Sequence, residues 1–199
     1  MNKQLLAVAL AAATVIAAPA HATTVALPGD GSWNAFNVDS FIASDFGNGW
    51  IADTNGSALN FTFTIGAGQV GTLTVVDAEY AGDTFSVTNF GNALGVTSSV
   101  PLATYDGSVD PVHDFDTALA DSSFSRGVFQ LHAGSYSISG SLLQSVQFLG
   151  ADLDATTGAV RLSISAIPEP SSTALMLGGL AAVALLARRR RAGKSAQTI

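Results

Sequence analysis

Alternating apolar and polar residues recur through the middle of the chain. The clearest case is Asn60–Ile65, where Phe61, Phe63 and Ile65 would face one side and the threonines the other. The same alternation predicts further strands at Thr72–Val75, Thr84–Val87, Val128–Leu131, Tyr136–Ile138 and Val160–Ile164. Turn residues separate these segments, and helical periodicity is almost absent. The pattern predicts a mainly β domain over residues 23–166, an antiparallel β-sandwich of jelly-roll-like form.

One glycine-rich segment joins two of the predicted strands. Gly66–Gly71 reads G-A-G-Q-V-G, which has the letters of the dinucleotide-binding fingerprint. That fingerprint works only where a helix N-terminus follows to receive a pyrophosphate. Here another β-type segment follows, so we predict a glycine hairpin.

The N-terminal segment has the three parts of a secretory signal peptide. Lys3 precedes an apolar run from Leu5 to Ala18, and Ala20-His21-Ala22 supplies a small-x-small cleavage pattern. We predict a signal peptide over residues 1–22, read by the general secretion machinery and cut by signal peptidase after Ala22. An uncleaved anchor is the alternative, which the shortness of the apolar run disfavours.

The C-terminal segment predicts a transmembrane helix over about residues 172–187. Its 16 uncharged residues would span roughly 24 Å, against roughly 30 Å for a bilayer core. The stop-transfer block Arg188, Arg189, Arg190 and Arg191 marks the cytoplasmic side. A buried core helix is the alternative, but the terminal position and the arginines favour a membrane segment. We expect a transient inner-membrane anchor with residues 192–199 as a cytoplasmic tail.

Pro168-Glu169-Pro170, the apolar segment and the arginine block, in this order over residues 167–191, resemble the sorting tail of PEP-CTERM proteins of Gram-negative bacteria. The resemblance implies that an exosortase, an integral membrane transpeptidase-like enzyme, recognises Pro168, Glu169 and Pro170 and removes the helix. It implies a mature protein at the cell surface or in the extracellular matrix, associated with exopolysaccharide or biofilm.

Charge is distributed unevenly along the chain. All 15 acidic residues lie between Thr23 and Pro170, where Arg126 and Arg161 are the only basic ones, giving this stretch a net charge of −13. Such a surface repels nucleic acid, so we expect no nucleic-acid partner, while divalent cations would be tolerated. There is no cysteine, so stability must come from an apolar core without disulfides.

One acidic segment has the composition of a cation-binding loop. It contains Asp106, Asp110, Asp114 and Asp116 beside His113. Flexible carboxylate-rich loops suit Ca²⁺, although Pro111 stands where an EF-hand needs glycine. A calcium site and a solvated acidic loop both stay open, and no other cofactor is expected.

Residues for catalysis are few. The chain has no cysteine and no G-x-S-x-G motif, and only His113 and His132 would remain after signal cleavage to act as a base. We therefore predict no catalytic residues and a non-enzymatic passenger domain. The alternatives are a carbohydrate-binding module, with or without Ca²⁺, and thirdly a hydrolase with paired carboxylates. Aromatic residues for a sugar platform would be Trp33, Trp50, Tyr80 and Tyr105, but we expect both tryptophans in the core.

Overall fold

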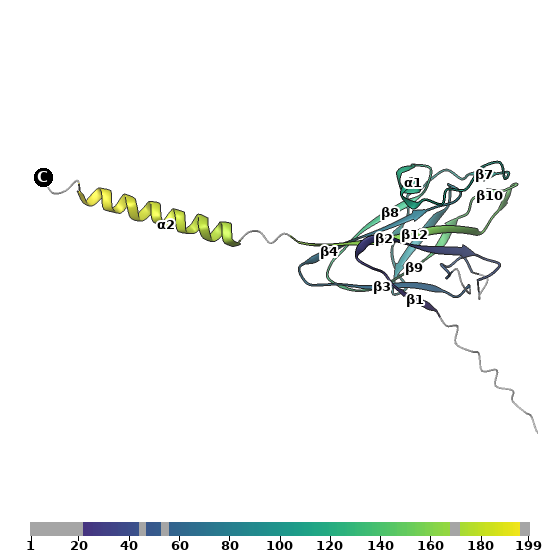
Figure 1. Cartoon of the computed structure of the whole chain (residues 1–199), viewed down its shortest axis with the longest axis horizontal. Helices are drawn as coiled ribbons and strands as arrows, with labels where there is room; N and C mark the ends of the chain where they lie inside the picture. Colours follow the sequence, from purple (N-terminus) through teal and green to yellow (C-terminus); the bar gives the residue numbers. More distant parts are fainter. Residues whose placement is uncertain (1–21, 44–46, 53–55, 168–171, 196–199) are drawn as a thin grey trace, which may run out of the picture.

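The computed structural model describes residues 22–43, 47–52, 56–167 and 172–195. Two β-sheets face each other in its main domain (Figure 1). The five-stranded sheet has the order β1 (Thr23–Ala26), β3 (Leu59–Ile65), β9 (Gly134–Gln144), β5 (Thr84–Asn89) and β6 (Asn92–Val96). The four-stranded sheet has the order β2 (Asp30–Asp39), β12 (Ala155–Ala166), β4 (Gln69–Asp77) and β8 (Arg126–Leu131).

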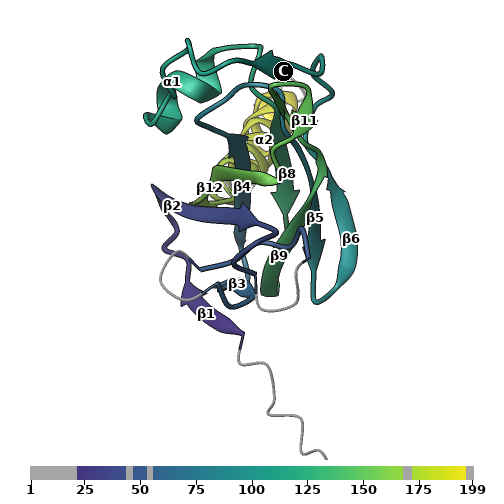
Figure 2. The ribbon, with the colours of Figure 1, turned by 90° about the vertical axis from the view of Figure 1, so that its right-hand side faces the viewer.

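Most strand pairs in these sheets are antiparallel, and β1 with β3 is a parallel pair. A small sheet has the order β11 (Ala151–Asp152), β10 (Gln147–Phe148) and β7 (Thr104–Tyr105). Together with helix α1 (Phe115–Ala120) it lies at the end of the domain away from β1 (Figure 2). The prediction of a mainly β fold with antiparallel-rich sheets is thus confirmed, and the jelly-roll-like form stays a prediction.

Alternate residues of both sheets fill the space between them. Leu73 and Val75 of β4, Val160 and Leu162 of β12, and Phe61, Ile65, Phe85, Val87 and Ile138 of the opposite sheet all belong to one buried cluster. Each fully buried side chain of this size stabilises the fold by about 1.5–3 kcal/mol relative to an exposed one. The alternation seen in the sequence therefore marks the face of each strand that forms the core.

A stacked pair of aromatic rings crosses the core. The Phe36 ring of β2 and the Trp50 indole lie 3.9 Å apart between centroids at an interplanar angle of 15°. The Phe85 ring meets both of them edge-on. Gly158 of β12 lies beside the Phe36 ring and Gly140 of β9 beside the Trp50 ring, and a Cβ at either glycine would come within 2.6 Å of those rings. The two glycines thus leave room for the stack.

A second apolar cluster lies on the outer face of the four-stranded sheet. Val76, Ala78 and Ala159 present this face, and Ala118 of α1 and Phe124 cover it. Asp114 is the N-cap of α1, and its carboxylate accepts the Thr117 N–H at 2.7 Å. The apolar side of the helix packs on the sheet through Ala118. The sheet is therefore covered on both faces at this end.

The six strands predicted from alternation are all present, each with longer bounds. The structure corrects the prediction at Gly66–Gly71, which is not a hairpin. The strands on either side, β3 and β4, belong to different sheets, so the turn carries the chain from one sheet to the other. Alternation shows which residues face inward, but it does not decide whether consecutive strands pair.

Candidate functional site

The predicted sorting segment directly follows the last strand of the domain. β12 ends at Ala166, and the Ile167 N–H donates a 2.8 Å hydrogen bond to the Gly68 carbonyl oxygen. Pro168, Glu169 and Pro170 lie outside the described residues, and helix α2 (Ser172–Ser195) comes next. The chain from Ile167 to Ser172 can reach at most about 18 Å. The segment that joins the domain to α2 is therefore short.

Helix α2 carries apolar side chains all around its axis. Leu175, Met176, Leu177, Leu180, Val183 and Leu185 are all exposed, between 59 and 74 %. At 100° per residue these positions leave no polar face, which is typical of a helix that has an apolar partner or environment. Arg188, Arg189, Arg190 and Arg191 lie within α2, near its end.

The predicted transmembrane helix over residues 172–187 is present as a helix. Among the described residues, no helix is long and apolar enough to cross a membrane.

The predicted signal peptide falls almost wholly outside the described residues. Ala20 is outside them, and Ala22 is the first residue described. β1 begins at Thr23, whose N–H donates to the Ala58 carbonyl oxygen at 2.7 Å. Cleavage after Ala22 would therefore leave β1 complete.

The four aspartates predicted to bind calcium have separate roles. Asp106 accepts the Ser108 N–H and Asp114 caps α1, and these hydrogen bonds from Ser108 and Thr117 hold the pKa of both carboxyls below the usual value. Asp116 binds Arg161. Among the described residues, no three His, Asp or Glu side chains come together as a metal site would need. The structure therefore does not bring the predicted ligands, including Asp110, into one group.

The two arginines of the domain both hold α1 against the sheet. The Arg161 guanidinium lies 4.3 Å above the Trp33 ring, and its Nη1 is 3.0 Å from the Asp116 carboxylate. Trp33 Nε1 donates to the same Asp116 oxygen at 3.1 Å. From the other side, Arg126 Nη1 donates to the Leu119 carbonyl oxygen. Both cations are thus used within the fold.

The aromatic residues considered for a sugar platform do not share one surface. Trp50 is buried at 2 % exposure, as predicted. The prediction for Trp33 is wrong, because it is half-buried on the outer face of the sheet beneath Arg161 and packs on Phe115. Tyr80 and Tyr105 form a separate pair with ring centroids 5.1 Å apart.

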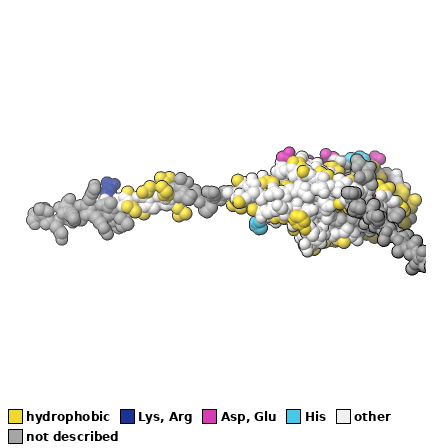
Figure 3. All heavy atoms as spheres, turned by 90° about the horizontal axis from the view of Figure 1, so that it is seen from below, with side chains coloured by type: hydrophobic (Ala, Val, Ile, Leu, Met, Phe, Trp, Pro, Cys, Tyr) yellow, Lys and Arg dark blue, Asp and Glu magenta, His cyan; other side chains and the backbone are white. Residues whose placement is uncertain are grey.

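The surface of the domain offers few cations. Figure 3 shows a face on which Asp and Glu side chains appear along one edge, and on which Lys and Arg colour appears only on the tail. Because Arg126 and Arg161 are engaged with α1, the acidic character expected from the sequence is also that of the surface.

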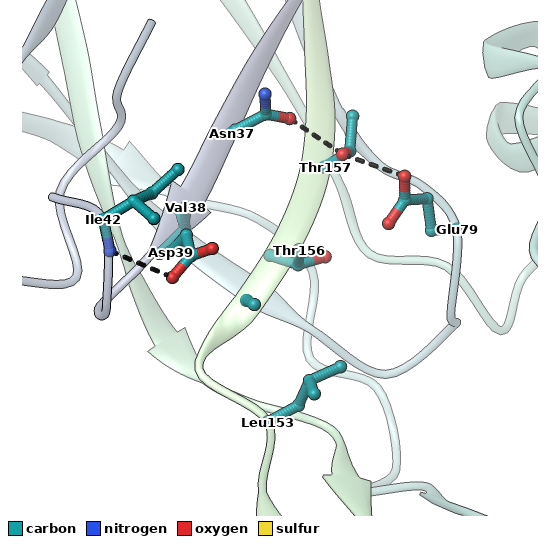
Figure 4. Close-up of a pocket in the computed structure, with 9 residues that line it drawn as sticks. Asn37, Val38, Asp39, Ile42, Glu79, Leu153, Thr156 and Thr157 are labelled. Carbon is teal, nitrogen blue, oxygen red and sulfur yellow. Dashed lines mark hydrogen bonds between the residues drawn. The ribbon is translucent and has the colours of Figure 1, made fainter. Parts of the chain in front are cut away.

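A hollow of about 370 Å³ opens beside the first residues of β12 (Figure 4). Asp39, Glu79, Thr156 and Thr157 are among the residues that line it. The Thr157 hydroxyl lies 2.8 Å from Asn37 Oδ1 and 3.0 Å from Glu79 Oε1. It has one proton, so it donates a hydrogen bond to one of these two oxygens at a time. The hollow is thus polar and acidic on this side.

Two acidic side chains of the domain, Asp77 and Asp83, are fully buried. Asp77 Oδ2 accepts the N–H groups of Gly82 and Asp83 at 3.3 and 3.2 Å, and Asp83 Oδ1 accepts the Val146 N–H at 2.7 Å. Burial, reinforced by the Asp83 charge, raises the pKa of Asp77 to about 9. Burial also raises the pKa of Asp83 to about 6. Neither carboxyl forms an ion pair with a described basic residue.

Sequence reasoning missed this buried pair, although a signal was present. Leu73 and Val75 alternate on the core face of a predicted strand, and Asp77 is the next position on that face. An aspartate where the pattern calls for an apolar residue indicates a buried carboxyl that needs partners.

The β domain is followed by an apolar helix with four arginines near its end, which is the order of parts in a C-terminal sorting signal. The family model for the PEP-CTERM protein-sorting motif matches residues 166–191. The predicted resemblance is thus confirmed: the chain contains a PEP-CTERM sorting motif. The motif implies export, membrane-anchored sorting before processing, and an exosortase as the processing partner.

Other comparisons add little. No curated protein matches the chain. The pre-peptidase C-terminal domain of a collagenase from Bacillus anthracis is similar to it with a TM-score of 0.38 and 12% sequence identity, over 74% of this chain and 99% of that one. At this level the likeness does not bear on the fold, which rests on the sheet order described above.

Proposed function

We propose that this chain is a non-enzymatic surface protein: an acidic β-sandwich passenger that is exported, held briefly at the inner membrane by α2, and released or attached at the cell surface after exosortase cleavage near Pro168-Glu169-Pro170. The observation that carries the proposal is the sorting motif at residues 166–191, attached without a spacer to the last strand of a folded domain.

The short helix suits a temporary hold. Its uncharged part, residues 172–187, would span roughly 24 Å, less than a bilayer core of roughly 30 Å. In this proposal the exosortase binds Pro168-Glu169-Pro170, which directly precedes the helix in the sequence. In this proposal the arginines at 188–191 stay on the cytoplasmic side until cleavage.

We also propose that the exported domain works within an exopolysaccharide or biofilm matrix. Its surface is acidic, so direct contact with an anionic polysaccharide would need divalent cations between the two. The roles of Arg126 and Arg161 in holding α1 support a structural domain, because the cations that would hold an anionic substrate are used within the fold.

The experiment is expression of the full chain in a host with and without an exosortase, followed by mass spectrometry of the C-terminal peptide. We expect the peptide containing residues 172–199 to be lost only where the enzyme is present. A Glu169→Ala variant is the matched control and should keep its tail in both hosts. Identical intact tails of the unaltered chain in both hosts would refute the proposal.

A further inference from the structure

Buried polar atoms without a hydrogen-bond partner gather at one place in the domain. The described residues contain four such side-chain atoms, and three of them are Asp77 Oδ1, Asp83 Oδ2 and Thr156 Oγ1. Asp77 and Asp83 are 0 % exposed and Thr156 is 7 % exposed. Buried polar atoms are normally paired, so three orphans together indicate a missing ligand rather than chance.

The strands direct these three side chains into the same space. Asp77 follows Leu73 and Val75 on the core face of β4, and Thr156 shares the core face of β12 with Val160. Asp83 directly precedes β5, whose alternate residues Phe85 and Val87 face the core from the opposite sheet. The three groups therefore meet between the sheets, at the end of the core.

Contacts confirm that the groups are neighbours. The Asp77 carboxylate accepts the backbone N–H of Asp83 at 3.2 Å. The Thr156 hydroxyl lies close enough to the Asp83 carboxyl to lower its pKa, yet no hydrogen bond of acceptable geometry joins them. Each carboxyl already uses one oxygen to accept backbone N–H groups, which fixes its orientation and leaves the other oxygen directed elsewhere.

No positive charge of the fold balances the two carboxylates. Arg126 and Arg161 are the only Lys or Arg residues of the domain, and both are bound at α1. The charged groups that act on Asp83 are Glu79 and Asp154, both acidic, and Tyr105 is the other titratable group that senses the pair. A buried pair of carboxyls must therefore take up protons or a cation from outside.

We propose that Asp77, Asp83 and Thr156 form a buried site for a divalent cation, and that Ca²⁺ fits it best. Ca²⁺ takes carboxylate, hydroxyl, carbonyl and water oxygens at about 2.3–2.6 Å in flexible numbers, so it accepts two carboxylates without a third acidic ligand. Of the three groups, Thr156 also lines the hollow of about 370 Å³, together with Glu79. Figure 4 shows Thr156 and Asp39 facing this hollow. This inference is independent of the sorting function.

The test uses the full chain, stripped with chelator and then titrated with CaCl₂ while unfolding by urea is followed. A free Ca²⁺ concentration of 100 times Kd should lower the unfolding equilibrium constant about 100-fold. Asp77→Asn and Asp83→Asn should lose this effect. Asp110→Asn is the matched control, because it removes a carboxylate from the exposed acidic loop, and it should keep the effect. No calcium effect in the unaltered chain, or an effect that both buried variants keep, would overturn the proposal.

A second measurement covers variants that do not fold. Tb³⁺ bound at this site lies near Tyr105, so exciting tyrosine in the unaltered chain should give Tb³⁺ emission that saturates at one ion and is displaced by Ca²⁺. The Asp110→Asn chain should behave identically. Absence of saturable emission would count against the site just as clearly. If the carboxyls instead only hold protons, neither calcium nor Tb³⁺ will have an effect.

Discussion

Replacing Gly140 by alanine tests whether this glycine makes room for Trp50. A Cβ at this position would lie 2.3 Å from the Ser86 carbonyl oxygen and 2.5 and 2.6 Å from Cε2 and Cζ2 of the Trp50 ring. None of these atoms moves easily, because Ser86 belongs to the neighbouring strand and the indole is stacked on Phe36. We therefore expect the change to open the sheet or unstack the rings.

The expected magnitude follows from two opposing effects. Overpacking a core costs about 1–3 kcal/mol. Alanine also restricts the unfolded chain, which stabilises by about 0.4–1 kcal/mol. With backbone and ring both in the way the cost lies at the upper end, so we expect a net loss of about 2 kcal/mol. For a protein of this size that lowers Tm by roughly 4–8 °C.

Gly49 provides the matched control. It lies one residue before Trp50, and the nearest atom to an added Cβ is the Gly140 carbonyl oxygen at 3.9 Å, an ordinary contact. Gly49→Ala should leave Tm unchanged or raise it slightly. The assay is thermal and urea unfolding of the full chain followed by near-ultraviolet circular dichroism, which reports on the stacked rings. Equal Tm values for the two variants would show that Gly140 does not accommodate Trp50.

Three further predictions concern charge. In chelator, the unfolding free energy should fall as pH rises from about 4 to about 9: the folded chain keeps protons on Asp77 (pKa about 9) and Asp83 (pKa about 6), whereas an unfolded aspartate releases its proton near 3.8. This stabilisation is complete below pH 3.8 and is lost as pH passes each folded pKa, so urea midpoints that increase over this range would contradict it. Arg161→Gln should destabilise the fold by about 1 kcal/mol, through loss of one ion pair and one cation–π contact, and should speed amide exchange in α1. Unchanged exchange there would show that Arg161 does not hold the helix. Changing the four arginines at 188–191 to glutamine should leave the tail uncleaved in a host with exosortase, as read by C-terminal mass spectrometry, and normal cleavage would show that they are not part of the signal.

The sequence predicted strands well because burial of one face imposes a period of two. Phe61, Phe63 and Ile65 in β3, or Leu73 and Val75 in β4, leave little choice of structure. Alternation does not predict β2, because only Phe36 and Val38 among its ten residues are buried apolar positions. Its outer face carries another large apolar residue, Trp33. The pairing of strands depends on contacts far apart in the sequence. The local pattern at Gly66–Gly71 therefore predicts a hairpin where the chain in fact passes from one sheet to the other.

The candidate sites divide in the same way. The sorting tail is a linear signal, so its residues are readable without a fold. A cation site cannot be read from a continuous stretch of sequence, because it depends on which oxygen atoms the fold brings together. The acidic loop has the right composition, but Asp106 and Asp114 accept local backbone N–H groups and Asp116 binds Arg161. The buried pair, Asp77 and Asp83, leaves one signal in the sequence, the position of Asp77 on the core face of β4, and its burial is seen only in the structure.

The position of β12 has a mechanical consequence. Residues 155–163 of this strand pair with β2 and residues 158–166 pair with β4, and the tail continues directly from it. A pull on the tail acts along the strand, perpendicular to its hydrogen bonds, so that both ladders resist together instead of opening one bond at a time. If the protein is tethered through this end, the force that flowing medium exerts on it passes into β12, the strand with the most extensive pairing in the domain.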